Sequence, residues 1–231
     1  MTDDLAKADG LAVSDTRCVR CDSPVVDADE WTWICPTHGT VVPLLPPHPL
    51  EHGEIETVAS QSRVPLWIPW PLPAGWMITG VRCAGSPLEP ARGVVIAASG
   101  PGVVSRADLV IVAEEPGIGL GARFAGLAGT DPGPEVTRLP ADVTIHADGR
   151  AAVLWSVPGV SDRAAYVGEA AGLWLWLVVW PVTEWMVVHD DLRVVDLRRR
   201  HDGADLSAVE LPFGNPTPLV AQLPPPPVQG Y

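Results

Sequence analysis

Three cysteines and one histidine near the N-terminus have the spacing of a metal site. They form two pairs, Cys18-x2-Cys21 and Cys35-x2-His38, separated by thirteen residues. Each pair on a tight turn can direct two ligands at one ion, and three thiolates with one imidazole complete a tetrahedral shell without an open position. The pattern predicts a structural zinc ion bound by all four residues. Because so short a segment cannot build a hydrophobic core, we expect zinc binding to supply its folding free energy.

Other chemistry of the cysteines fits less well. A thioredoxin-type CxxC lies in a βαβ unit and needs no second pair of ligands, and an iron site of the rubredoxin type normally has four cysteines. Paired cysteines that bind no metal remain an alternative. The fourth cysteine, Cys83, stands alone in an apolar run, where we expect a buried small residue and not a nucleophile.

A glycine-rich segment, Glu114-Glu115-Pro-Gly117-Ile-Gly119-Leu-Gly121-Ala-Arg123, follows an apolar run. Its glycines could approach a phosphate, and Arg123 could meet an anion. However, two carboxylates precede the glycines, no Lys-Ser/Thr follows, and the spacing is GxGxG where a dinucleotide loop has GxGxxG. A structural turn is the favoured interpretation, and a ligand loop that uses Glu114, Glu115 and Arg123 is the alternative.

The remaining polar groups give no catalytic site. His189, Asp190 and Asp191, with Glu169, could form an acid–base or metal cluster, but a solvated turn is the more common role of such a pair of aspartates. The run 198–201 (Arg-Arg-Arg-His) is interpreted as the solvated end of a strand. No serine lies in a G-x-S-x-G elbow. We therefore predict no catalytic residues.

Charge excludes several classes of protein. The chain has 231 residues, with 15 Lys and Arg against 28 Asp and Glu, a net charge of −13. Such a chain repels phosphate backbones, so we expect no nucleic acid and no membrane as partner. Residues 17–42 carry two arginines against four acidic residues. The sole lysine is Lys7, which excludes P-loop and Schiff-base chemistry in the folded part.

These residues must be positioned by a sheet. Several β-rich runs are separated by Gly and Pro turns, including hairpin signals at Gly100-Pro-Gly102 and Asp148-Gly149. The spacing of Val182, Trp185, Met186 and His189 predicts a helix with one apolar face. The fold class is therefore α+β, mostly antiparallel β, with one or two helices. The predicted strands are 66–70, 76–83, 93–99, 107–113, 142–146, 152–157, 165–168, 172–180 and 193–197.

The chain contains ten tryptophans. In Leu173-Trp-Leu-Trp-Leu177, Trp174 and Trp176 share one strand face and the leucines the other. We expect a strand covered on both sides, with an exposed aromatic platform as the alternative. In the segment that carries the predicted zinc ligands, alternation likewise places Trp31 and Trp33 on one face.

Composition divides the chain into five parts. We expect a disordered tail (1–16), a zinc ribbon (17–42), a Pro-rich linker with a short helix near 54–62 (43–62), a Trp-rich β domain (63–211) and a Pro-rich disordered tail (212–231). The start lacks the basic and apolar regions of a signal peptide, and the longest uncharged apolar run is 170–183, too short to cross a bilayer. These features predict a cytoplasmic protein.

The chain resembles an uncharacterised family of actinobacterial proteins with an N-terminal zinc ribbon. The resemblance rests on CxxC…CxxHG, on segments 63–76, 109–123 and 166–169, on the Leu-Trp-Leu-Trp strand and on Asp190-Asp191-Leu192. It covers about residues 17–200. Some members carry an automatic phosphotransacetylase label, but this sequence has no recognisable acyl-phosphate or coenzyme A site. The expected function is a non-enzymatic protein-interaction or regulatory module. The alternative is an enzyme or a binder of small anions that uses the 114–123 loop.

Overall fold

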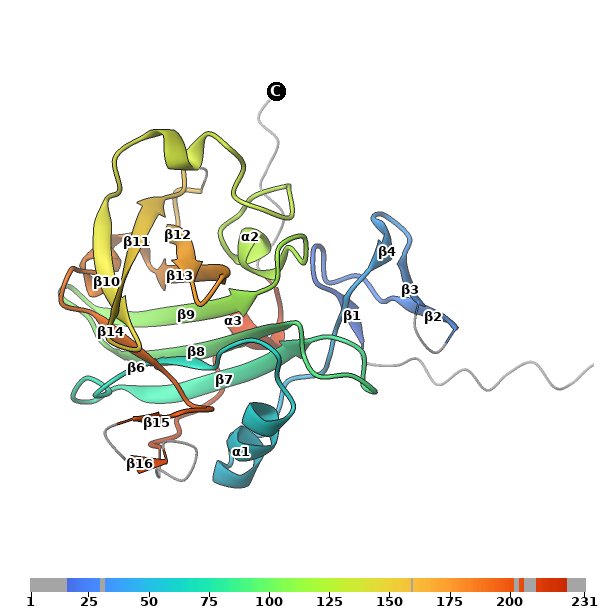
Figure 1. Cartoon of the computed structure of the whole chain (residues 1–231), viewed down its shortest axis with the longest axis horizontal. Coiled ribbons are helices and arrows are strands. Elements are labelled where there is room, and N and C mark those ends of the chain that lie inside the picture. The colour runs from blue at the N-terminus through green and yellow to red at the C-terminus, as the bar shows by residue number, and fades with distance from the viewer. Residues whose placement is uncertain (1–15, 30–31, 159, 202–203, 206–210, 224–231) are drawn as a thin grey trace, which may run out of the picture.

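The computed structural model describes residues 16–29, 32–158, 160–201, 204–205 and 211–223 (Figure 1). The tail 1–15, Trp31 and residues 224–231 lie outside this part. The strands are β1 (Arg17–Cys18), β2 (Val26–Asp29), β3 (Thr32–Cys35), β4 (Gly39–Val41), β5 (Pro43–Leu44), β6 (Trp67–Pro69), β7 (Met77–Ala84), β8 (Gly93–Pro101), β9 (Arg106–Glu114), β10 (Val143–Ala147), β11 (Arg150–Ser156), β12 (Ala164–Ala170), β13 (Leu173–Trp180), β14 (Arg193–Asp196), β15 (Arg200–His201) and β16 (Ala204–Asp205). The helical segments are α1 (His52–Ser60), α2 (Leu120–Phe124), η1 (Val136–Arg138), η2 (Val182–Val187) and α3 (Pro218–Ala221).

Within the described residues, eleven strands form one sheet in the order β1-β5-β7-β8-β9-β13-β12-β11-β10-β14-β6. All neighbours are antiparallel except the β10–β14 pair. The edge strand β6 lies against β8 and β9, so the sheet curls back on itself. The predicted α+β class with mostly antiparallel sheet is confirmed, and each predicted strand range contains a strand.

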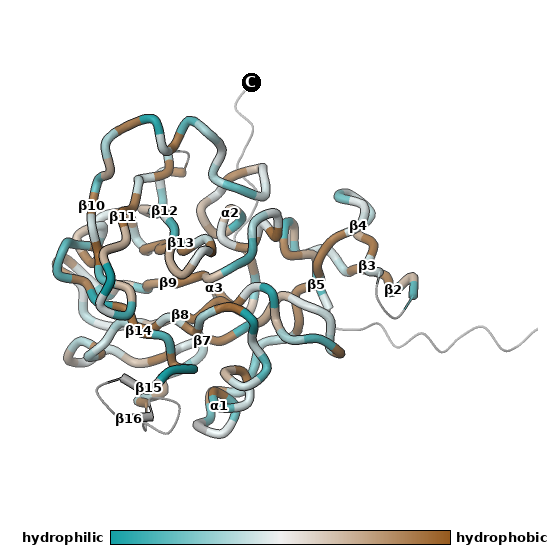
Figure 2. The backbone as a smooth tube through the Cα atoms, in the orientation of Figure 1, coloured by the Kyte–Doolittle hydropathy of each residue, from teal (hydrophilic) through white to brown (hydrophobic). Residues whose placement is uncertain are grey.

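The sheet is covered on both faces. Side chains on the concave face form one core with α1, β6 and β14, and those on the convex face pack with α2 and α3. The central strands β8 and β13 are accordingly buried at almost every position. These strands consist largely of hydrophobic residues and run through the middle of the molecule (Figure 2). The two-sided burial expected for β13 is found, since Trp176, Leu175 and Leu177 are all buried. Trp174 is only partly covered.

The ribbon is a second sheet, in which β2, β3 and β4 pair in sequence and project from one side of the curled sheet (Figure 1). Its flanking strands belong to the large sheet: β1 pairs with β5, and β5 pairs with β7. The Pro-rich linker (43–62) is therefore held more tightly by the sheet than its many prolines indicated. Leu45 and His48 donate backbone hydrogen bonds to Cys83 and Val81 of β7.

The segment after Pro181 differs from the predicted helix. It forms the 3-10 segment η2, in which Trp185 and Met186 are 53% and 50% exposed, whereas Glu184 is fully buried. A 3-10 turn has about three residues, so positions spaced for an α-helix no longer share a face. Glu184 also turns inward because its carboxylate accepts backbone hydrogen bonds from Val103, Val104 and Ser105.

The C-terminal segment also departs from the expected disorder. Residues 211–223 lie on the sheet: Gly214 and Thr217 donate backbone hydrogen bonds to Ile78 and Thr79 of β7. Val220 of α3 is buried above Gly80, where any Cβ would come within 2.8 Å of the valine. Prolines do not prevent this packing, because a few apolar side chains between them reach the convex face.

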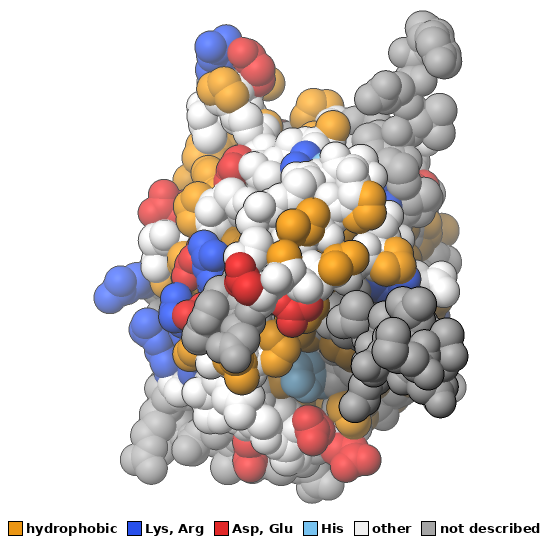
Figure 3. Space-filling model, turned by 90° about the vertical axis from the view of Figure 1, so that its right-hand side faces the viewer, with side chains coloured by type: hydrophobic (Ala, Val, Ile, Leu, Met, Phe, Trp, Pro, Cys, Tyr) orange, Lys and Arg blue, Asp and Glu red, His pale blue; other side chains and the backbone are white. Residues whose placement is uncertain are grey.

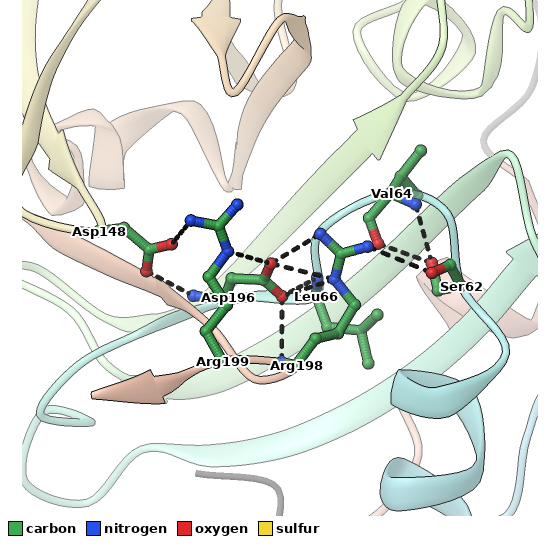
Figure 4. A network of polar contacts seen from close by, with 7 residues as sticks. All are labelled: Ser62, Val64, Leu66, Asp148, Asp196, Arg198 and Arg199. Atoms are coloured by element: carbon green, nitrogen blue, oxygen red, sulfur yellow. Dashed lines mark hydrogen bonds and ion pairs between the residues drawn. The ribbon is translucent and has the colours of Figure 1, made fainter. Parts of the chain in front are cut away.

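Arg198 is not at a solvated strand end. Its guanidinium binds both carboxylate oxygens of the fully buried Asp196, at 2.7–3.0 Å, and donates to the carbonyl of Ser62 (Figure 4). Asp196 also accepts the backbone N–H of Leu66 at 3.0 Å. The network joins β14 to the chain entering β6. Arg199, 60% exposed, fits the predicted solvation.

No helix in the described ranges is long and apolar enough to cross a membrane.

Candidate metal centre

The four predicted ligands meet at one point. Cys18 ends β1, Cys21 lies in the turn after it, Cys35 ends β3, and His38 lies in the turn before β4. Their ligand atoms all lie within 4.8 Å of one another. Cys18 and Cys35 are buried, and the other two are partly exposed. No other group of three or more His, Cys, Asp or Glu in the described chain is close enough to hold an ion.

The distances fit a tetrahedral ion. Metal–ligand bonds of about 2.3 Å to sulfur and about 2.0 Å to nitrogen place neighbouring ligand atoms about 3.5–3.8 Å apart. The Cys18 Sγ to His38 Nδ1 distance is 3.6 Å, Cys35 Sγ to His38 Nδ1 is 3.7 Å, and Cys21 Sγ to Cys35 Sγ is 3.6 Å. The four donors therefore fit one ion.

Both knuckles have the same backbone shape. The residue after each ligand pair, Asp22 and Gly39, has a left-handed conformation with φ of 61° and 68°. In the first knuckle the N–H of Asp22 donates to the carbonyl of Cys18 at 2.9 Å, and the N–H of Arg20 donates to the Cys18 sulfur at 3.4 Å. A tight turn with a left-handed exit directs two side chains to the same side, which the C-x2-C and C-x2-H spacings require.

The pKa values of the ligands are shifted in different directions: those of Cys35 and His38 favour the forms that bind a metal, and that of Cys18 favours the protonated thiol. Burial raises the pKa of the Cys18 thiol to about 12. Burial also raises the pKa of Cys35, but N–H donors of Thr37 and His38 outweigh it and leave the pKa below its usual value. Burial and the nearby arginines 20 and 123 lower the pKa of His38, which keeps the imidazole neutral as a ligand must be.

Two arginines border the ligands. Arg123 of α2 is 4% exposed, and burial lowers its pKa while the thiol of Cys21 raises it. Arg20 reaches across from the first knuckle and donates to the carbonyl of Ala128 at 3.0 Å. A divalent ion with three thiolates carries a net charge of about −1, so these cations complement the loaded centre.

The glycine-rich loop turns out to support α2. The fully buried carboxylate of Glu114 accepts the backbone N–H groups of Leu120 and Gly121 at 2.8 and 3.0 Å. Burial raises the pKa of Glu114 to about 8 despite these donors. Gly121 is required by space, because a Cβ there would lie 2.1 Å from the ring of Trp176.

The other loop residues have separate partners. Glu115 forms an ion pair with Arg92 at 2.7 Å, and Gly117 donates its N–H to Asp131 at 2.9 Å. Gly117 and Gly119 have φ of 86° and 88°, which glycine adopts without strain. Glu114, Glu115 and Arg123 thus face α2, Arg92 and the cysteines respectively, not one another.

Sequence reasoning missed Arg82, which joins the ribbon to the sheet. Its side chain is 2% exposed in the middle of β7. The guanidinium donates to the carbonyls of Leu45, Val220 and Ala221 at 2.6, 3.2 and 2.9 Å, and lies 3.9 Å from Asp22 of the first knuckle. An arginine between apolar residues was the available signal, since a buried charge needs partners from elsewhere in the fold.

Cys83 follows the sequence interpretation. It is 4% exposed, and burial raises its pKa to about 12, so it is a packed thiol and not a nucleophile. His189, Asp190 and Asp191 lie at the surface after η2, and the carboxylate of Asp190 accepts the N–H of Thr144 at 2.9 Å. Glu169 is exposed on β12.

Comparison with known proteins gives the family and nothing further. No curated protein and no solved structure matches the chain. One family model covers the ribbon, the curled sheet and α3, matching residues 13–220. The chain belongs to this family, a family of unknown function designated DUF6758.

Proposed function

We propose that the protein is a cytoplasmic, non-enzymatic module whose ribbon contacts another protein, and that Cys18, Cys21, Cys35 and His38 bind a structural zinc ion. Three thiolates and one imidazole in a closed shell are typical of structural zinc. Bound there, zinc supplies folding free energy to the ribbon. Elemental analysis of freshly purified protein tests the metal: about one zinc per chain is expected, and its absence contradicts the proposal.

An exposed apolar pair on the outer ribbon face carries the proposal of a protein partner. Val26 and Ile34 are directly opposite each other in the β2–β3 ladder and are 59% and 42% exposed. The residue before Ile34, Trp33, points inward and is 7% exposed. Hydrophobic side chains also gather on the side of the molecule from which the ribbon projects (Figure 3). Apolar groups at the centre of a projecting face are what protein interfaces use.

The charge of the ribbon argues against nucleic acid. It has two arginines and four acidic residues. Arg20 has a buried Nε and donates to the carbonyl of Ala128, so it does not contribute to a basic outer face. Counterion release, which drives non-specific binding, needs a basic surface. We expect no salt-sensitive binding to duplex or single-stranded oligonucleotides in anisotropy titrations, and micromolar binding that weakens steeply with salt would contradict this.

Affinity capture from the native host, with mass spectrometry, tests the partner. The bait is the full chain, compared with Ile34→Glu on the outer ribbon face and with Val153→Glu on β11. Val153 is a matched control because it is 43% exposed on a strand of the large sheet. A protein captured by the unchanged chain and by Val153→Glu, and lost with Ile34→Glu, supports the proposal. Equal capture by all three baits contradicts it.

A second function, binding of a small anion beside the ribbon, is favoured by one observation. Arg20 and Arg123 line a cavity of about 440 Å³, and the buried Nε of each has no hydrogen-bond partner among the residues that the structure describes. Calorimetric titration of inorganic phosphate into the zinc-loaded chain tests it. Heat of binding at millimolar phosphate that is lost in Arg123→Met supports this function, and no binding removes it.

A further inference from the structure

Another hollow lies on the curled sheet away from the ribbon. It has a volume of about 560 Å³ and opens where β10 and β12 begin and β11 ends, beneath η2. We call it the mouth cavity. Its floor is part of the concave-face core, since Val143, Val188 and Tyr166 belong to both. Cavities at the mouth of a curled or closed sheet are common ligand sites.

Tyr166 brings an unused polar group to this cavity. The residue is 8% exposed, with its ring in the concave-face core. Within the described chain its hydroxyl makes no hydrogen bond, and the oxygen keeps some exposure, so it is open to the cavity. Burial, and then the charge of Asp142, raise the pKa of Tyr166, so the hydroxyl stays protonated.

The charged groups around the cavity have one sign. Asp142, Asp190 and His189 are its titratable lining groups beside Tyr166, and no lysine or arginine lines it. Each carboxylate is fixed through one oxygen: Asp142 accepts the N–H of Ser156 at 2.7 Å, and Asp190 accepts the N–H of Thr144 at 2.9 Å. The second oxygen of each has no hydrogen-bond partner in the described residues. Two oriented carboxylates without a counter-ion favour a cation.

The rim adds an aromatic and an apolar wall. Trp185 and Met186 line the cavity and are about half exposed. The preceding residue, Glu184, orients this segment, because its buried carboxylate accepts hydrogen bonds from the N–H groups of Val103 and Ser105. Trp185 and Met186 therefore remain at the surface. The face of an indole attracts ammonium groups, and a nearby thioether packs against alkyl chains.

We infer that the mouth cavity binds a small organic ammonium ion that carries an aromatic or alkyl group. The ammonium group would lie between the carboxylates of Asp142 and Asp190 and the indole of Trp185. The organic group would pack on Met186 and the apolar floor. This inference is independent of the zinc ion and of the ribbon, which lie elsewhere on the molecule.

The test uses three probes of similar shape and different charge: 2-phenylethylammonium, 2-phenylethanol and phenylacetate. Each is titrated into the zinc-loaded full chain while indole N–H signals are followed by NMR, with Trp185→Phe to assign the Trp185 signal. We expect 2-phenylethylammonium to shift that signal and to bind about tenfold more tightly than the alcohol. Phenylacetate should bind most weakly.

Matched variants separate the cavity from net charge. Asp142→Asn keeps an acceptor for Ser156 and should reduce the preference for the ammonium over the alcohol at least about threefold. Glu169→Gln removes the same charge from the exposed face of β12 and should leave the preference unchanged. Equal binding of amine and alcohol, an equal effect of both variants, or no binding at about 10 mM would overturn the inference. Unchanged indole spectra of the free variants establish that they fold.

Discussion

Among the described residues, the core of the ribbon consists of four buried side chains, two of which are candidate metal ligands: Cys18, Val25, Trp33 and Cys35. The curled sheet buries two extensive apolar clusters, one on each face. Burial of apolar surface can stabilise the sheet alone, whereas the ribbon has too little of it. We therefore expect the ribbon to need an ion and the curled sheet to fold without one, and we expect the junction between them to decide how far they unfold separately.

Removal of the metal should have the largest effect. Structural zinc contributes on the order of 10 kcal/mol to a site of this kind, far more than the ribbon core can replace. A chelator should therefore unfold β2–β4 and leave the curled sheet folded, which hydrogen exchange resolved by segment measures. We expect loss of protection in 26–41 and retained protection in β8, β9 and β13.

Two cysteine variants sharpen this experiment. Cys35→Ser removes a ligand and should reproduce the effect of the chelator, whereas Cys83→Ser, in a buried strand of the sheet, should keep its zinc. One cooperative transition of the whole chain on chelation would contradict the separation of the two regions. Such a result would mean that β1 and β5 transmit the loss of the ion into the large sheet.

Arg82 tests the junction, with the next largest effect. Arg82→Met removes a buried guanidinium that donates to three carbonyls and leaves Asp22 without its nearest cation. The loss of these partners should lower the free energy of unfolding by about 3 kcal/mol, measured by urea denaturation. Arg106→Met, at an exposed position of β9, should change it by less than about 0.5 kcal/mol. Equal effects would contradict the role of Arg82.

Local patterns determined what could be predicted. The CxxC…CxxH spacing identified four side chains that the fold brings close enough to bind one metal ion, because a knuckle is encoded within a few residues. Hairpin turns such as Asp148-Gly149 located the strands. The buried, hydrogen-bonded roles of Arg82 and Glu184 were not predicted, because their partners lie on segments distant in sequence. The glycines of 117–121 indicated a turn, but only the structure shows that Glu114 and Trp176 require it.

Two buried carboxylates extend the comparison within the sheet region. Glu114 receives two backbone donors, and burial raises its pKa to about 8 from an ordinary 4.5. A raised pKa stabilises the fold at low pH, and this contribution is lost as pH rises from 4.5 towards 8. We expect the chain to lose about 3 kcal/mol of stability between pH 5 and 8 relative to Glu114→Gln, measured by urea denaturation at both pH values. If the stabilities of the two proteins depend on pH in the same way, the pKa of Glu114 is not raised by its burial.

Glu184 should show the opposite dependence, with a smaller effect. Burial raises its pKa, but the N–H groups of Val103, Val104 and Ser105 and the Ser105 hydroxyl outweigh it and hold the pKa below the usual value. A lowered pKa stabilises the fold above the ordinary glutamate pKa, and this contribution is lost as pH falls through the lowered value. Urea denaturation at pH 5.5 and 3.5 should therefore show a greater loss for the unchanged chain than for Glu184→Gln. Glu135→Gln, in a surface ion pair with Arg138, should follow the unchanged chain. The opposite order would mean that the donors do not compensate the burial of Glu184, and that η2 and its exposed Trp185 are held by packing instead.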